Sequence, residues 1–275
     1  MEQLHGSKHI SSLDLASLRA QLGRPAKMVV FESPINPTLR VVDIEAVVAA
    51  AREAGASTVF DGTFSPPPIH RVLDLGVDLV VHSATKFFGG HSDVLAGVVA
   101  GRHAHLGPIE SWRRRTGGLL APDVAWLLQR SWPTLSLRVQ AQQDNALALA
   151  RGLQELARTG ALAAVTYPGL EDHPDREIVA RQMQGGGAVL SFELPGGMPA
   201  VLAALDRLQV IARGASLGGV ETLATAPAYT THAPLSPQQR ADAGISDGLM
   251  RIAVGLEPVE ELMADLRQAI SGVRN

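Results

Sequence analysis

Residues 82–93 read His-Ser-Ala-Thr-Lys-Phe-Phe-Gly-Gly-His-Ser-Asp and combine hydroxyl, amine and glycine groups within one short segment. They directly follow the apolar run 79–81, so a buried strand is expected to end in a loop at this point. In such a loop the hydroxyls of Ser83 and Thr85 can hold a phosphate group. Lys86 would then point at the molecule to which the phosphate belongs.

A carboxylate closes a second apolar run upstream, where Val59-Phe60-Asp61 precedes a glycine. Pyridoxal 5'-phosphate (PLP) is held by three kinds of group: phosphate-binding hydroxyls, a lysine amine and a carboxylate. Here all three lie at neighbouring predicted strand ends. This cofactor forms a Schiff base with a lysine and needs an acidic partner for its ring nitrogen. The pattern therefore predicts PLP as cofactor, with Lys86 and Asp61 as its main ligands.

The composition is that of a globular protein without unusual partners. The chain has 275 residues, a formal charge of −3 and no cysteine. These values predict no nucleic-acid partner and exclude thiolate metal sites and thiol nucleophiles. The first residues lack the basic and apolar pattern of a signal peptide, and no apolar stretch is long enough to span a bilayer. A cytoplasmic protein with no membrane partner is the expectation.

The first half of the chain alternates helical and strand patterns, which favours an α/β fold with a parallel sheet covered by helices. Helical spacing is found at 13–22, 44–54 and about 69–75, and strand patterns at 27–31, 57–61 and 78–81. In such sheets ligands bind beyond the carboxyl ends of the strands. Asn36, Asp61 and the loop 83–86 each follow a predicted strand, so we expect them to face one crevice.

The second half of the chain has a different pattern of predicted helices and strands. Residues 120–158 are predicted to be largely helical with a break at Pro133, and strands at 188–194 and 250–254 alternate with helices at 199–207 and 257–270. This pattern favours a smaller α+β domain. We therefore expect two domains, residues 1–136 for the PLP-binding domain and residues 137–275 for the second.

Five segments of the chain together resemble the Cys/Met-metabolism PLP enzymes, the transsulfuration family. They are Glu32-Ser33-Pro34-Ile35-Asn36-Pro37-Thr38, Asp61-Gly62-Thr63-Phe64, residues 80–97, Ser216-Leu217-Gly218-Gly219-Val220-Glu221-Thr222, and residues 244–251. Their order and spacing are similar to those of the family. The resemblance implies the PLP-dependent transferase-like fold, fold type I, for the large domain.

The resemblance also implies roles for individual positions. Lys86 would form the Schiff base and later move protons, and Asp61 would pair with the pyridinium nitrogen. The remaining positions divide into cofactor ligands (Ser83, Thr85 and Thr63) and groups at the substrate carboxylate (Asn36, Ser216 and Arg251, with Arg251 as the main anchor). An arginine suits this last role because its planar fork binds a carboxylate through two parallel hydrogen bonds.

The reaction implied by the resemblance is β- or γ-elimination, or γ-replacement, on cystathionine, methionine or homoserine esters. A carbon–sulfur lyase is the first choice, and a homoserine-ester sulfhydrylase or cystathionine γ-synthase is the alternative. A homodimer or homotetramer is also implied. Ala215 stands where cystathionine-processing members often carry Glu, which argues mildly against cystathionine as substrate.

The large domain is expected to be incomplete at its N-terminus. Family members carry a further segment before the part that matches, with a phosphate-binding turn, a ring-stacking tyrosine and an arm that reaches the neighbouring subunit. Tyr167 and Tyr229 are the only tyrosines here, and both lie in the second domain. Gly62 also replaces a usual Asn. An alternative reading is therefore a truncated, non-catalytic PLP-binding remnant or a subunit that needs the missing segment.

Two other readings of the same residues are weaker. His70, His82 and His91 lack metal-ligand spacing, so packing or loop roles are expected and no metal site is predicted. Ser83-Ala84-Thr85-Lys86 also matches the S-x-x-K of penicillin-interacting acyl enzymes. That chemistry needs Ser83 to begin a helix, whereas the sequence predicts that a strand runs into the motif.

Overall fold

The computed structural model describes residues 14–23 and 26–273. Within them, the first half of the chain forms a four-stranded sheet in the order β1-β2-β3-β4. The strands are β1 (Met28–Glu32), β2 (Ser57–Asp61), β3 (Leu79–Ser83) and β4 (Gly97–Gly101). The first three are parallel and β4 runs antiparallel to β3. The parallel part agrees with the sequence prediction, whereas β4 was not foreseen.

One face of this sheet is covered by α2 (Leu15–Leu22), α3 (Ile44–Glu53) and the 3₁₀ turn η1 (Val72–Leu75). α3 begins where Asp43 accepts a hydrogen bond from the N–H of Ala46, the expected N-cap. Its buried side, including Val47, packs with Phe60 and Val80 of the sheet. Full burial of each such side chain stabilises the fold by about 1.5–3 kcal/mol. The predicted helix start at Leu13 lies outside the described residues.

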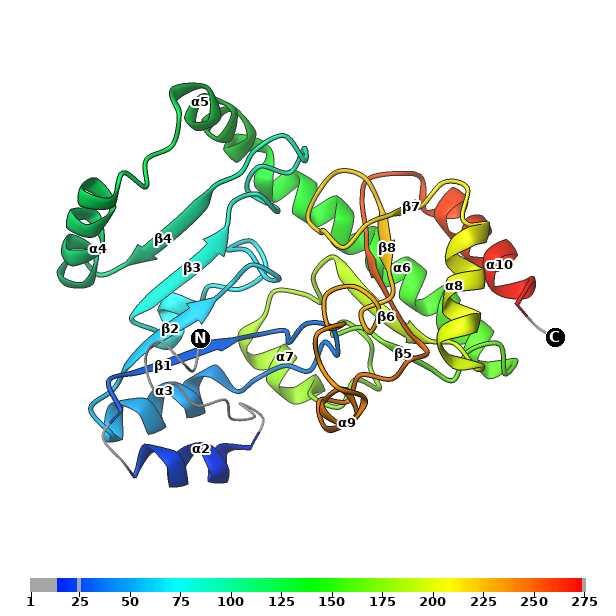
Figure 1. Ribbon diagram of the computed structural model, residues 1–275, viewed down its shortest axis with the longest axis horizontal. Helices are drawn as coiled ribbons and strands as arrows, with labels where there is room; N and C mark the ends of the chain where they lie inside the picture. The colour runs from blue at the N-terminus through cyan, green and yellow to red at the C-terminus, as the bar shows by residue number, and fades with distance from the viewer. Residues whose placement is uncertain (1–13, 24–25, 274–275) are drawn as a thin grey trace.

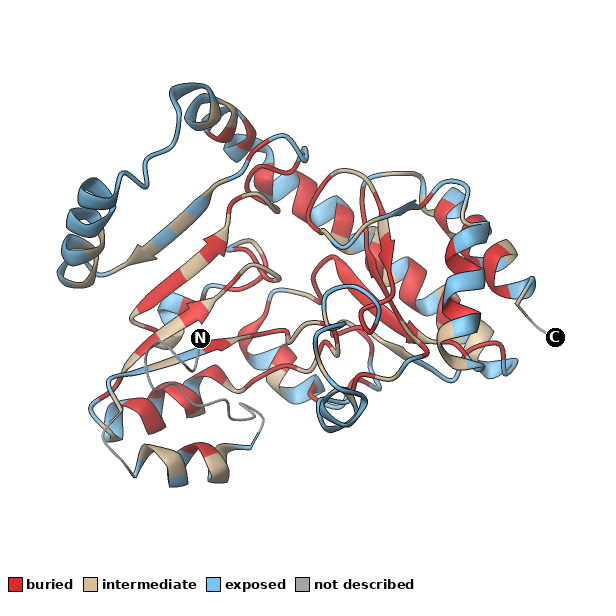
Figure 2. Ribbon diagram, in the orientation of Figure 1, coloured by how far each residue is buried: buried red, intermediate tan, exposed pale blue. Residues whose placement is uncertain are grey.

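The opposite face of the sheet has no covering helix within the described residues. Strand periodicity and register place Met28, Val30, Val59, Val81 and Val99 on this face, which we call the open face. Met28 and Val30 are 52% and 65% exposed. Figure 2 shows the exposed and half-buried colours along β1 and β4.

A helical arm projects beyond β4 and is formed by α4 (His103–Thr116) and α5 (Pro122–Ser131) (Figure 1). α4 buries none of its residues within the described chain. The chain then passes through the 3₁₀ turn η2 (Trp132–Thr134) into α6 (Leu135–Arg158). α4 was not predicted, but the helical stretch broken near Pro133 was. The predicted domain boundary at 136/137 falls inside α6 and stays a prediction.

The second half folds around a five-stranded sheet in the order β5-β6-β9-β8-β7. α6, α8 and α10 pack with this sheet in one apolar cluster that includes Leu153, Leu190 and Ile252. The elements not yet given are β5 (Ala164–Thr166), α7 (Arg176–Gln182), β6 (Val189–Glu193), α8 (Gly197–Arg207), β7 (Ala212–Arg213), β8 (Leu223–Thr225), α9 (Pro237–Asp242), β9 (Leu249–Ala253) and α10 (Val259–Ser271). The α+β character agrees with the sequence analysis.

Candidate active site

The carboxyl ends of β1, β2 and β3 lie side by side and present the predicted site residues at one edge of the first sheet. Asp61 and Ser83 are the last residues of β2 and β3, and Asn36 follows β1 by four positions. The register pairs Glu32 with Asp61 across β1 and β2. The expectation that these residues follow neighbouring strand ends is therefore met.

The turn after β3 is closed by backbone hydrogen bonds from Lys86 N to Ser83 O (3.1 Å) and from Gly90 N to Lys86 O (2.7 Å). Ser83 ends a strand and begins no helix, so the acyl-enzyme reading of the motif has no structural support. The glycine pair is required locally. A Cβ on Gly89 would lie 2.3 Å from Val94, and Gly90 has a φ of +71°.

Lys86 reaches from this turn to the second half of the chain. Its Nζ donates a hydrogen bond of 2.7 Å to Ser216 Oγ, 130 positions away. Burial and the positive charge of Arg251 both lower the pKa of Lys86 below its ordinary value of 10.5. A lower pKa increases the fraction of neutral amine, the form in which a lysine is a nucleophile.

Arg251 on β9 is 1% exposed and has no acidic partner within the described residues. Its Nη1 donates to Asn36 Oδ1 (2.9 Å), and its Nη2 donates to the carbonyls of Ala215 (2.8 Å) and Ser216 (3.0 Å). Burial lowers its pKa from 12.5 to about 10. The buried Nε has no hydrogen-bond partner. A buried, unpaired guanidinium is costly unless it meets an anion, so this group is suited to bind a carboxylate.

Asp61, Thr63 and Ser83 form a second hydrogen-bonded group. The N–H of Thr63 donates to Asp61 Oδ1, and the N–H of Ser83 donates to Thr63 Oγ1, both at 2.9 Å. Asp61 and Ser83 are half-buried and lie on the open face of the sheet. Thr85 behaves differently, because its hydroxyl bonds with the backbone of Ala96. Its predicted role as a phosphate ligand stays a prediction.

Three further side chains belong to this region and were not singled out as site residues from the sequence. The ring of Phe64 lies 5.8 Å from the guanidinium of Arg251. Glu32 accepts the N–H of Asn36 (3.1 Å), and burial, together with the charge of Asp61, raises its pKa. The ring of His82 packs 5.0 Å from that of Phe88. Glu32 sits in a motif quoted above, but nothing local in the sequence indicated burial.

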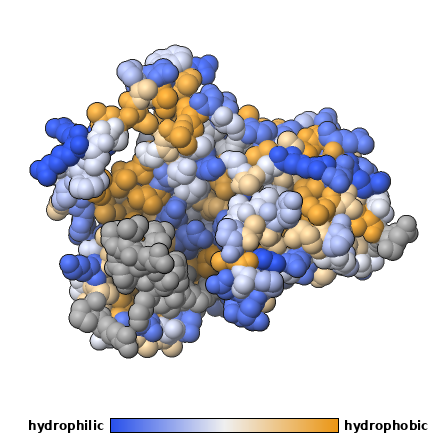
Figure 3. All heavy atoms as spheres, in the orientation of Figure 1, coloured by the Kyte–Doolittle hydropathy of each residue, from blue (hydrophilic) through white to orange (hydrophobic). Residues whose placement is uncertain are grey.

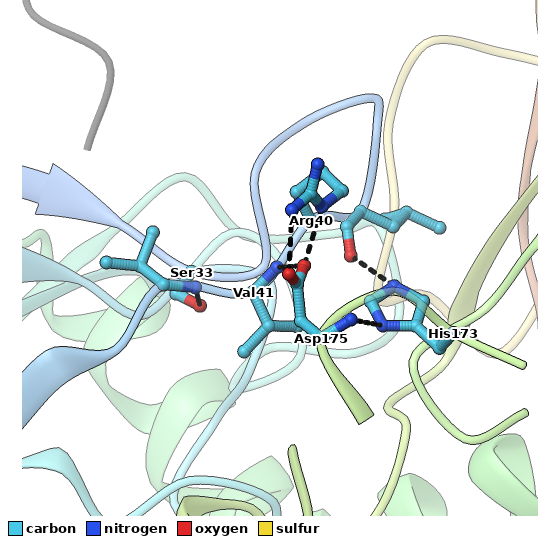
Figure 4. Close-up of polar contacts among 7 residues, drawn as sticks. Ser33, Arg40, Val41, His173 and Asp175 are labelled. Atoms are coloured by element: carbon cyan, nitrogen blue, oxygen red, sulfur yellow. Dashed lines mark hydrogen bonds and ion pairs between the residues drawn. The ribbon is translucent and has the colours of Figure 1, made fainter. Parts of the chain in front are cut away.

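The loop that carries Asn36 is held by residues of the second half. Asp175 accepts two hydrogen bonds from Arg40 (2.7 and 2.8 Å) and one from the N–H of Val41 (2.7 Å). His173 Nε2 lies 3.1 Å from the carbonyl oxygen of Leu39. Figure 4 shows the Asp175 carboxylate pointing at Arg40 and Val41, with the His173 ring beside it. These contacts fix the path of the chain on the C-terminal side of Asn36.

Other arrangements have little support in the described part of the chain. No group of three or more His, Cys, Asp or Glu side chains is placed to hold a metal ion. No described helix is both long and apolar enough to cross a membrane. The groups that the described chain brings to this region are an amine, carboxylates, hydroxyls and one buried guanidinium.

Comparison with known proteins decides the family. The model of the Cys/Met metabolism PLP-dependent enzyme family matches residues 4–271. The chain belongs to this family. The L-methionine γ-lyase of Pseudomonas putida is 41% identical to this chain over 265 residues, which are 96% of this chain and 66% of that protein. The cystathionine β-lyase of Lactococcus lactis subsp. cremoris is 40% identical over 262 residues, 95% of this chain and 67% of that protein.

Solved structures of the family share the fold. The crystal structure of cystathionine γ-lyase from Lactobacillus plantarum, complexed with L-serine, has a TM-score of 0.90 and 39% identity, covering 97% of this chain and 69% of that one. This chain therefore has an α/β fold that matches the structures of transsulfuration enzymes over the aligned part. The chain spans about two-thirds of the length of the curated relatives it matches.

Proposed function

We propose that this chain carries the catalytic and substrate-binding groups of a PLP-dependent enzyme that acts on sulfur amino acids or homoserine esters by β/γ-elimination or γ-replacement. The observation that carries the proposal is the connected path from Lys86 through Ser216 to Arg251. It joins a nucleophilic amine to a buried guanidinium that lacks an anion.

The polar groups left without protein partners fit the cofactor. Among the described residues, the second carboxylate oxygen of Asp61 and the hydroxyl of Ser83 have no hydrogen-bond partner, and the Lys86 amine bonds only to a hydroxyl. Asp61 would hold the pyridine nitrogen, and Ser83 and Thr85 would hold the phosphate, as the family resemblance implies. Thr63 would be a further cofactor ligand. When bound, PLP supplies an electron sink for the charge that develops on the substrate α-carbon.

The chain's own residues would then perform positioning and proton transfer. Arg251 would bind the substrate carboxylate through charge-assisted hydrogen bonds, with Asn36 and Ser216 orienting the guanidinium. Lys86 would hold the cofactor covalently. When not bonded to the cofactor, the Lys86 amine would take the proton from the substrate α-carbon. The resulting charge at the α-carbon would favour loss of a β-substituent, whereas loss of a γ-substituent would also need removal of a proton from the β-carbon.

A carbon–sulfur lyase is our first choice, because L-methionine γ-lyases and cystathionine β-lyases are among the similar relatives. The O-succinylhomoserine sulfhydrylase of Pseudomonas aeruginosa, at 39% identity and 64% coverage of that protein, keeps a transferase as the alternative. Activity assays distinguish a lyase from a sulfhydrylase. The protein is incubated with methionine, cystathionine or O-succinylhomoserine, each with and without sulfide, and the products are identified. A lyase releases a 2-oxoacid and ammonia without added sulfide, whereas a sulfhydrylase needs sulfide to form a new amino acid.

The first test is chemical and does not require turnover. Protein incubated with PLP is reduced with borohydride, and the added mass is located by peptide mapping. We expect one adduct per chain at Lys86, none in Lys86→Ala, and an unchanged adduct in the control Lys27→Ala. No adduct in folded protein would favour the alternative of a non-catalytic remnant or a subunit that needs a further segment.

A further inference from the structure

Glu32, the last residue of β1, has no part in the proposed function, yet it lies between two groups that do. The register pairs it with Asp61 across β1 and β2, and side-chain alternation places both carboxyl groups on the open face. Neighbouring strands lie about 4.8 Å apart. A second carboxyl group therefore stands next to Asp61 at the edge of the sheet where the cofactor groups are proposed.

The Glu32 carboxyl group also holds the backbone of Asn36. Its Oε1 accepts the N–H of Asn36 at 3.1 Å. Donors are scarce in this loop, because Pro34 and Pro37 have no N–H. On the C-terminal side, Ser191 Oγ donates to the carbonyl of Pro37 at 2.9 Å. Glu32 and Ser191 thus fix the backbone on either side of the Asn36 side chain.

The Asn36 side chain extends this contact to Arg251. Its Oδ1 accepts a hydrogen bond of 2.9 Å from Nη1 of Arg251, so two consecutive hydrogen bonds join Glu32 to the guanidinium. Figure 3 shows hydrophilic atoms (blue) in the middle of the molecule, between orange hydrophobic areas to either side. Because the buried Nε of Arg251 has no hydrogen-bond partner, the direction of the guanidinium decides where an anion would bind.

An acid at position 32 is not needed for the hydrogen bond alone. Glu32 is half-buried and has no other hydrogen bond and no ion pair in the part of the chain that the structure describes. Burial raises its pKa above the ordinary value, which means that the ionised form is disfavoured in the folded chain. A glutamine could accept the same N–H without this cost. An acid at such a position points to a function of its charge.

The charge that acts on Glu32 is that of Asp61 on the neighbouring strand. It adds to the effect of burial on the pKa of Glu32, whereas the N–H of Asn36 opposes both. Arg40, on the same loop as Asn36, is paired with Asp175, and Arg251 contacts Asn36 rather than Glu32. A cationic group at Asp61 would offset its charge and favour the ionised Glu32. A carboxylate is a stronger acceptor than a neutral carboxyl group, so the bond to Asn36 would tighten.

We propose that Glu32 is a positioning residue that couples the two ends of the proposed site. Its carboxylate fixes the backbone of Asn36 and thereby the direction of Arg251. A cationic ring held at Asp61 strengthens this hold, so that cofactor and substrate carboxylate favour each other's binding. The inference rests on the proposed function, which assigns Asp61 to the cofactor and Arg251 to the substrate carboxylate.

A pH titration of the cofactor-free wild type, followed by NMR, tests the connection. The signals are the side-chain carboxyl carbon of Glu32, the amide of Asn36 and the Nε–H of Arg251. We expect all three to move with one midpoint. In Asn36→Ala the Arg251 signal should no longer follow Glu32. An Arg251 signal that ignores the Glu32 midpoint in the wild type would overturn the proposal.

A second titration tests the coupling to Asp61. Asp61→Asn removes the neighbouring negative charge and should therefore move the Glu32 midpoint to lower pH. Asp74→Asn is the matched control, since that exposed carboxylate pairs with Arg71 on the covered side of the sheet. Equal midpoints of Glu32 in the two variants would contradict the coupling.

Kinetics of the PLP-loaded protein test the positioning role. Glu32→Ala should raise the KM for methionine about fivefold, with a smaller change in kcat, because one hydrogen bond that holds Asn36 is lost. Glu32→Gln keeps an acceptor oxygen and should recover part of the loss, and in Asn36→Ala the replacement of Glu32 should add little. The control Glu53→Ala changes an exposed carboxylate at the end of α3. A wild-type KM in folded Glu32→Ala, with only a lower melting temperature, would show a structural role and overturn the proposal.

The borohydride assay separates this inference from the proposed function, since the NMR titrations need no cofactor. Joint movement of the three signals without an adduct on Lys86 supports the coupling through Asn36 and contradicts the function. An adduct on Lys86 with an Arg251 signal that is independent of Glu32 supports the function and contradicts the inference.

Discussion

Asn36 Oδ1 accepts a 2.9 Å hydrogen bond from Nη1 of Arg251, although the two residues are separated by 215 positions. The bond joins a loop beyond the first sheet to the centre of the second. The Nε atom of the same guanidinium is buried without a hydrogen-bond partner. The orientation of this proposed carboxylate anchor therefore depends on both halves of the fold.

Replacement of Asn36 by Ala should weaken substrate binding more than it slows the chemical step. Arg251 would keep its two carbonyl contacts but lose the acceptor at Nη1, and a hydrogen bond to a charged group contributes about 1.5–3 kcal/mol. We expect the KM of the PLP-loaded protein to rise about tenfold or more, with a smaller change in kcat. Steady-state kinetics on methionine measures both. A fall in kcat alone would contradict the assigned role.

The charge of Arg251 should contribute to the pH at which Lys86 reacts with PLP. Burial and, to a smaller extent, the charge of Arg251 lower the pKa of Lys86, so removing the charge should raise that pKa. In Arg251→Gln the midpoint of the pH–rate profile for adduct formation should therefore move to higher pH, with slower attachment at neutral pH. Arg251→Lys keeps the charge and is the matched control. A profile that is the same in both variants would rule out the electrostatic effect.

Asp175→Asn should destabilise the fold, because Asp175 is 7% exposed and accepts hydrogen bonds from Arg40 and Val41. We expect a loss of about 1–3 kcal/mol in the free energy of unfolding, measured with urea. Asp172→Asn is the control, since that carboxylate is exposed and bonds only to Gln154. Equal losses for the two variants would contradict a specific role of Asp175.

The same carboxylate gives a pH dependence of stability. Burial alone would raise the pKa of Asp175, but the hydrogen bonds and charge of Arg40, with the N–H of Val41, outweigh burial and hold it below 3.8. The stabilisation is therefore complete above the ordinary carboxyl pKa and is lost as the pH falls through the lower, folded-state value. Between pH 5 and pH 2 the wild type should lose more stability than Asp175→Asn.

Gly62→Ala should disturb the site through His82. A Cβ at position 62 would lie 2.4 Å from His82 Cε1, and that ring is buried against Phe88. Overpacking of this kind costs about 1–3 kcal/mol. In the double variant Gly62→Ala/His82→Ala the two losses should be less than additive, as urea unfolding can measure. Strict additivity would show that the ring moves away without cost.

Much of the first sheet could be predicted because β1 and β3 contain continuous apolar runs, and β2 contains Val59 and Phe60 after β-favouring Thr58. β4 was missed because Gly97 and Gly101 leave only three apolar residues between them. α4 was missed because it contains Gly107 and Pro108, which are poor helix formers, and has few apolar residues, in keeping with its lack of buried residues. A helix that buries none of its residues within the described chain needs no continuous apolar side, so the sequence carries little periodicity to detect.

The site could be predicted in part. Ligands bind beyond the carboxyl ends of parallel strands, so the local strand pattern alone places Asn36, Asp61 and Ser83 at one edge of the first sheet. Ser216 and Arg251 came only from family resemblance, because strand alternation by itself favours a solvent-facing arginine, whereas Arg251 is 1% exposed. The clamp by His173 and Asp175 spans about 135 positions, and no local pattern encodes such a contact.

β9 is the last strand in the chain and also the central strand of the second sheet, between β6 and β8. On a ribosome that adds about 5–20 residues per second, β6 and β8 must therefore wait for the final part of synthesis before they can pair through it. Lys86, by contrast, emerges early. During synthesis the chain would expose a reactive amine well before it acquires the arginine that recognises substrate, so substrate selection is the last property to be acquired.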